Sequence, residues 1–167
     1  MFSLRCTRKL LGKLKVKPDL SPPAPTTRLG DWYASTFNVG WNRLVLCTSE
    51  RTLLPVLVPI AGPDLPGKLE MALGEMLKSI GVPATLADEE LRQMSELTVG
   101  KAASLSVLGS MQDFKRMARF EVAEKPSLLH VSLELAEAPC GPMKYRTPIE
   151  ATLEAFGVER RRYAGSR

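Results

Sequence analysis

Five polar residues in the segment KAASLSVLGSMQDF offer the densest local chemistry in this sequence: Lys101, Ser104, Ser106, Ser110 and Asp113. If Ser106 caps a helix, the following residues contribute free backbone amides to its first turn, and such amides favour an anion. Lys101 would add positive charge, whereas the carboxylate of Asp113 opposes it. The segment therefore predicts a ligand site for a phosphate group at Lys101, Ser104, Ser110 and Asp113.

Two further considerations apply to this candidate site. Arg51, at the tip of a predicted hairpin, is an additional ligand-binding candidate. Helix capping, together with a close approach of the helix to the sheet at Gly109, explains most of the same residues without any ligand. The pattern thus leaves a phosphate site and a purely structural interpretation open.

The sequence lacks the sets of residues that nucleophilic catalysis and zinc binding require. His130 is the only histidine and lies in an apolar amphipathic segment, so we interpret it as a residue at the edge of the core. Neither a GxSxG elbow nor a Gly-rich phosphate loop occurs. Cys6, Cys47 and Cys140 form no CxxC pair, and we expect them to be buried free thiols without a metal or cofactor.

A divalent metal site is the remaining catalytic alternative. It would gather the carboxylates of Asp31, Glu50 and Asp113, with Lys101 nearby, as in a nuclease. Nothing in the spacing of these carboxylates requires them to meet. We expect no metal site.

The aromatic residues Trp32, Tyr33 and Trp41 have rings that stack on bases when a sheet face is open. Aromatic residues at strand positions more often belong to the core. Trp32 alternates with polar positions beside an apolar hairpin, so we predict that it is buried and structural.

Positive charge is concentrated at the two ends of the chain. The formal net charge is +5, yet removal of residues 1–17 and 159–167 leaves 13 basic and 17 acidic residues. Basic ends bind phosphate without sequence specificity, and they are also common as plain solvated tails. The candidates for contact with nucleic acid are Arg8, Lys9, Lys13, Arg160, Arg161 and Arg162.

The first half of the chain predicts strands. They are expected at 2–6, 31–39, 43–49 and 52–60, the last three forming an antiparallel meander, although a helix over 31–39 is also possible. Pro55 and Pro59 lack amide donors and place the last strand at a sheet edge. A short basic helix follows Thr7, and a proline-rich linker spans 18–27.

The second half changes to helical periodicity. A helix over 65–80 ends at Gly81, a second opens at Thr85 and runs toward Leu97, and a third is capped by Ser106. Residues 128–138 fit a helix capped by Ser127 or an alternating strand. A capping box over 147–150 opens the last helix.

This order predicts an α+β fold: a small antiparallel β-sheet, made of the N-terminal strand and a three-stranded meander, covered on one face by four to five helices. We expect one domain over 1–158 and a basic, disordered tail over 159–167. The apolar run before Pro63 is too short and too proline-rich to span a bilayer, and the N-terminus lacks the apolar run of a signal peptide. These features predict a cytoplasmic protein with no membrane partner.

Four stretches carry a family resemblance: LGDWYA (29–34), LVLCTSERTLLPVL (44–57), SVLGSMQDF (106–114) and LAEAPCGPMKYRTP (135–148). Together they resemble a family of small bacterial and archaeal proteins catalogued as a domain of unknown function. The resemblance implies an intracellular prokaryotic protein and assigns no catalytic role. Gln112 departs from the asparagine that is frequent before the aspartate in that family.

Two functional hypotheses follow from the sequence. The first is a non-enzymatic binding module for a protein partner or nucleic acid, since catalytic residue sets are missing and both ends are basic. The alternative is an enzyme that acts on a phosphate-containing substrate through the polar residues of 101–113.

Overall fold

Strand β1 (Phe2–Cys6) lies inside a five-stranded mixed sheet of order β4-β3-β2-β1-β5. The structure is a computed structural model, and it describes residues 1–62, 64–122 and 127–160. The other strands are β2 (Trp32–Val39), β3 (Asn42–Ser49), β4 (Pro55–Pro59) and β5 (Leu97–Lys101). The α-helices are α1 (Arg8–Leu14), α2 (Leu65–Ile80), α3 (Ala84–Gln93), α4 (Leu105–Glu121), α5 (Leu128–Ala136) and α6 (Pro148–Ala155), with a short 3₁₀ helix η1 (Gly141–Met143).

The predicted meander is confirmed. Strands β2, β3 and β4 pair antiparallel, with Val39 opposite Asn42 at the first turn and Leu46 opposite Leu57 in the second pair. The first turn has only two residues between its strands, and Gly40 adopts a positive φ of 56° there, as tight hairpins require. The alternative of a helix over 31–39 is therefore wrong.

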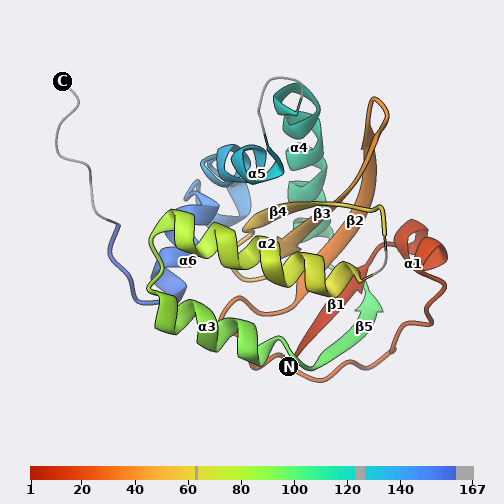
Figure 1. Cartoon of the computed structure of the whole chain (residues 1–167), viewed down its shortest axis with the longest axis horizontal. Coiled ribbons are helices and arrows are strands. Elements are labelled where there is room, and N and C mark those ends of the chain that lie inside the picture. The colour runs from red at the N-terminus through yellow and green to blue at the C-terminus, as the bar shows by residue number, and fades with distance from the viewer. Residues whose placement is uncertain (63, 123–126, 161–167) are drawn as a thin grey trace.

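The prediction of a purely antiparallel sheet, covered on one face, is wrong. Strand β1 pairs in parallel with β2 and also with β5. The sequence predicts the end of the second helix, running toward Leu97, where the structure has β5. Parallel neighbours need long crossover connections, and helices supply them here on both faces of the sheet. Figure 1 shows α2 and α3 on one side of the sheet and α4 and α5 on the other.

Each face of the sheet carries its own apolar core, as alternation along the strands dictates. Trp32 and Ala34 point into the core beneath α1, α2, α3 and α6. Tyr33 and Phe37 point into the second core, which α4 and α5 complete with Met111, Phe114 and Val131 among other residues. The prediction that Trp32 is buried is confirmed, with 0% of its surface exposed.

Local capping signals identified most helix ends. Helix α2 ends at Gly81 with φ +97°, Ser127 caps α5 through the amide of His130, and Thr147 and Glu150 form the predicted capping box of α6. Residues 128–136 are therefore a helix, and the strand alternative is wrong.

Helices α3 and α4 begin earlier than predicted. Helix α3 follows Pro83, so Thr85 lies inside it rather than at its cap. Helix α4 is capped by Ser104, whose hydroxyl accepts a hydrogen bond from the amide of Val107, and Ser106 is an exposed residue of the first turn. The predicted close approach of the helix to the sheet at Gly109 is absent, because a Cβ added to Gly109 would meet nothing within 4 Å.

Both outer strands of the sheet have partners beyond it. The amide of Leu57 in β4 donates to Ser132 Oγ at 3.0 Å, and alternation along the strand turns Pro55 and Pro59, which have no amide hydrogen, the same way. The carbonyl of Pro59 accepts from Lys68 Nζ at 3.1 Å. On the other side of the sheet, the amide of Asp19 in the proline-rich linker donates to the carbonyl of Val99 in β5 at 2.7 Å.

Of the helices that the structure describes, none has the length and apolarity needed to cross a bilayer.

Candidate nucleic-acid interface

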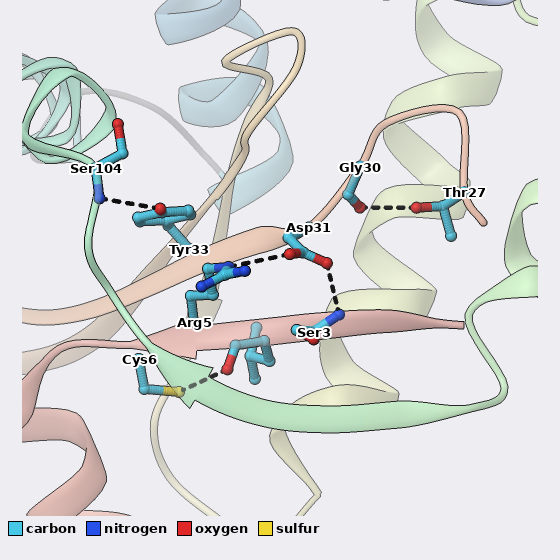
Figure 2. A network of polar contacts seen from close by, with 9 residues as sticks. Ser3, Arg5, Cys6, Thr27, Gly30, Asp31, Tyr33 and Ser104 are labelled. Carbon is cyan, nitrogen blue, oxygen red and sulfur yellow. Dashed lines mark hydrogen bonds and ion pairs between the residues drawn. The ribbon is translucent and has the colours of Figure 1, made fainter. Parts of the chain in front are cut away.

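A largely buried polar contact at the start of β2 is structural. Asp31, with 1% of its surface exposed, accepts hydrogen bonds from the backbone amide of Ser3 at 2.8 Å and from Arg5 Nε at 3.0 Å. Figure 2 shows both bonds converging on this carboxylate beside strand β1. Asp31 thus fixes the start of β2 against β1, because its two oxygens are used to hold the parallel pair together.

The residues of the predicted 101–113 site are spread over the end of β5 and along α4. Lys101 is exposed at the end of β5, and Ser104 caps α4 while its amide donates to the hydroxyl of Tyr33 at 3.1 Å (Figure 2). Ser110 is buried with 7% of its surface exposed. Asp113 has a side chain that is 68% exposed and pairs with Arg116 at 3.4 Å. Nine residues separate Ser104 from Asp113, about 13 Å along a helix, so the four do not converge on one ligand.

The other candidate ligand, Arg51, is engaged within the fold. Its Nη1 donates to the carbonyl of Thr27 at 2.9 Å, and its side chain covers Gly30, where an added Cβ would lie 2.9 Å from Arg51 Cγ. This contact holds the 27–30 turn that leads into β2. Glu90 of α3 supports the same turn, since its buried carboxylate accepts from the amides of Arg28 and Leu29.

The three carboxylates considered for a metal site have separate surroundings. Asp31 is bound to Arg5, Glu50 is exposed in the turn after β3, and Asp113 faces solvent on α4. Within the described ranges, no three histidine, cysteine, aspartate or glutamate side chains gather closely enough to hold a metal ion.

Histidine and the thiols have local roles. His130 is exposed on α5, with Nδ1 at 2.6 Å from Ser127 Oγ, so it lies farther from the core than predicted. Cys6, Cys47 and Cys140 are free and buried, as predicted. Burial raises the pKa of the Cys6 thiol to about 12 and also raises the pKa of the other two, so none is a ready thiolate at neutral pH.

The described parts of the two basic ends lie on different sides of the molecule. Arg8, Lys9 and Lys13 are exposed on α1, whereas Arg160 follows α6 on the opposite side (Figure 1). Arg160 pairs there with Glu137 at 2.9 Å and with Glu150 at 3.5 Å, so acidic groups offset its charge. Arg161 and Arg162, with the rest of the predicted tail over 161–167, lie outside the described residues.

The positive charge of Lys9 on α1 acts on a buried lysine of α4. Lys115 of α4 is buried, with 6% of its surface exposed, and its Nζ donates to Ser35 Oγ of β2 at 2.5 Å. Burial lowers the pKa of Lys115, and the positive charges of Arg119 on α4 and Lys9 on α1 lower it further. We refer to the exposed residues Arg8, Lys9 and Lys13 of α1 and Arg119 of α4 as the α1–α4 basic surface. In the described part of the chain, Lys115 forms no ion pair with a carboxylate.

The buried lysine predicts a pH dependence of stability. Because folding lowers its pKa, the folded state resists protonation of Lys115, and the protein gains stability as the pH rises from the folded pKa toward the ordinary lysine value. Relative to Lys115→Met, the unmodified protein should gain unfolding free energy between pH 7 and pH 10.

Urea denaturation of both proteins at the two pH values measures this difference. Lys78→Met is the matched control, since Lys78 is exposed on α2 and its replacement should leave the pH dependence unchanged. An equal pH response of the parent and Lys115→Met would contradict the prediction.

An exposed tryptophan lies near the end of α4. Trp41 occupies the turn between β2 and β3 with its side chain fully exposed, at 101% of the reference surface. Trp41 and Arg43 line one groove together with Val122, the residue that follows α4. Arg119 lies about one helical turn before Val122, so the groove adjoins the α1–α4 basic surface.

Lys115 and Arg119 were not predicted as functional residues from the sequence, although the sequence contains a signal at Lys115. Lys115 falls on the stripe of Met111, Phe114 and Ala118 that faces the core, and a lysine on such a stripe is unusual. Its proximity to Lys9 depends on tertiary packing and has no local signal.

Comparison with known proteins gives one match. The sequence model of the family described as a domain of unknown function (DUF6933) matches residues 3–151. No curated protein and no solved structure matches the chain.

Proposed function

Since this chain belongs to the DUF6933 family, whose description names no activity, we propose its function from its surface: a non-enzymatic module that binds nucleic acid through the phosphate backbone. The proposed contact is the α1–α4 basic surface. The observation that carries the proposal is a buried lysine, Lys115, which has no carboxylate partner in the described chain and whose pKa the positive charges of Lys9 and Arg119 lower further.

Charge distribution supports this location. Residues 1–18 contain six basic residues and no acidic one, and α1 holds three of them in exposed positions. The positive charges of Lys9 and Arg119 disfavour the charged form of the buried Lys115, and a phosphate bound to the exposed Lys9 and Arg119 would offset that repulsion. The remainder of the chain is acidic overall, which limits affinity for a long duplex.

The two alternative functions have less support. An enzyme acting through 101–113 needs Lys101, Ser104, Ser110 and Asp113 around one substrate, and these residues are spread along β5 and α4. A protein partner needs a surface with a defined occupant, and the described surfaces do not define one.

Binding should be weak, indifferent to sequence and strongly dependent on salt. We expect a dissociation constant of ~10⁻⁴–10⁻⁶ M at physiological salt, because each phosphate contact releases counterions. In a Lys9→Ala/Arg119→Ala double variant, binding at low salt should weaken about tenfold. The slope of log K against log salt should become shallower by about 1.4–1.8, the contribution of two phosphate contacts.

Fluorescence anisotropy with labelled DNA and RNA over a salt series measures both quantities. Lys78→Ala/Arg92→Ala is the matched control, because it removes the same charge from exposed positions on α2 and α3. Absence of binding by the parent protein at low salt would refute the proposed function. An equal loss of binding affinity in both double variants would show that the nucleic acid does not bind specifically at α1 and α4.

A further inference from the structure

A groove of about 610 Å³ opens beside the turn that joins β2 to β3. Trp41 and Arg43 form its wall on the hairpin side, and Leu44, Val122, Leu128 and Val131 give it an apolar lining. No acidic side chain is among the described residues that line it.

We propose that this groove receives an unpaired base of single-stranded nucleic acid, stacked on the indole of Trp41, with the adjoining phosphate next to Arg43. The inference rests on the proposed function and narrows it to a substrate class. It makes the protein a binder of single strands rather than of duplexes.

The exposure of Trp41 is the first argument. The protein has two tryptophans, and the other, Trp32, has 0% of its surface exposed. A two-residue turn with glycine at its first position requires no tryptophan at the second, so Trp41 has no evident role in forming the hairpin. A fully exposed indole beside an arginine offers a stacking platform and a phosphate contact in one place.

The composition and position of the groove give the second argument. Its apolar lining excludes a phosphate but accepts the flat face of a base. In a duplex that face is stacked between neighbouring pairs, and a flipped base costs unstacking energy. Because Arg119 lies about one turn of α4 before Val122, phosphates of the same strand can reach the α1–α4 basic surface while a base occupies the groove.

The test compares Trp41→Ala with the parent protein on a labelled homopyrimidine single strand and on a duplex of equal length. The parent should bind the single strand more tightly. Trp41→Ala should weaken single-strand binding by about 5- to 150-fold, the range expected for one lost stacking contact, and should leave duplex binding unchanged. Because Trp32 is buried, quenching of tryptophan fluorescence by the single strand should also disappear in Trp41→Ala.

Tyr145→Ala is the matched control, because Tyr145 is an aromatic residue that is 77% exposed and does not line the groove. It should bind both nucleic acids as the parent does. If Trp41→Ala binds the single strand as tightly as the parent, or loses single strand and duplex equally, the base site is refuted while phosphate binding stands. If the parent binds neither at low salt, the proposed function fails and the base site fails with it. Loss of self-association in Trp41→Ala without nucleic-acid binding would assign the groove to a second copy of the chain and overturn the proposal.

Discussion

Trp32→Ala is expected to lower the free energy of unfolding by about 3–5 kcal/mol, the cost of removing a large side chain from a packed core. Trp32 has no exposed surface and lies on β2 between Leu4 of β1 and Ser49 of β3. Its indole Nε1 has no hydrogen-bond partner within the described structure, so the whole loss comes from packing. Urea denaturation followed by circular dichroism measures the change.

Trp41→Ala is the control for this measurement, because it removes the same side chain from a fully exposed position. Its stability should stay within about 0.5 kcal/mol of the parent. A loss below about 1 kcal/mol for Trp32→Ala would show that the core closes over the site or that Trp32 is not packed as described.

Asp31→Ala should lower the free energy of unfolding by about 3–5 kcal/mol, since it removes one partner of a largely buried ion pair. The change leaves the buried amide of Ser3 unpaired and removes the carboxylate that Arg5 contacts, whose side chain is only 22% exposed. Asp31→Asn should cost less, because one amide oxygen can still accept from Ser3.

Denaturation of the two variants separates the two contacts of Asp31. The difference between alanine and asparagine reports the bond to the Ser3 amide, and the remaining loss reports the pair with Arg5. Glu50→Ala, at an exposed carboxylate in a turn, serves as the control and should change little. If Asp31→Ala were as stable as this control, the parallel pairing of β1 and β2 would not depend on the carboxylate.

Elements whose evidence is local were predictable from the sequence. Helix α2 ends where Gly81 and Pro83 end it, and α6 begins where Thr147 and Glu150 form a capping box. Strands β2 and β3 are joined by a tight turn, so their antiparallel pairing follows from chain connectivity. In each case the deciding residues lie within a few positions of the feature.

Features that depend on distant contacts were not predictable. Strand β5 pairs Leu97 with Phe2, a residue near the start of the chain, and no residue close to Leu97 in the sequence indicates that partner. Ser104 and Ser106 are both suitable N-cap residues. Ser104 is the residue that caps α4, and its amide also donates a hydrogen bond to the Tyr33 hydroxyl. Local signals could not decide between them.

The candidate interface divides in the same way. Arg8, Lys9 and Lys13 were predicted from the sequence as candidate phosphate contacts together with the C-terminal arginines. In the fold the charge of Lys9 acts on Lys115 of α4, and Arg160 is paired with Glu137. A sequence gives the sign of each charge, whereas the packing of helices decides which charges share a surface.

The contacts along the two outer strands have a consequence for assembly. A sheet edge with free amides can template addition of another molecule, and repeated addition leads to fibrils. Here Pro55, Pro59 and the Leu57–Ser132 bond leave β4 without a donor at those three positions, and the linker at Asp19 lies against β5. These contacts make both outer strands poorer templates for strand addition at the positions that they occupy. The base site proposed at Trp41 would use side chains rather than an extension of the sheet.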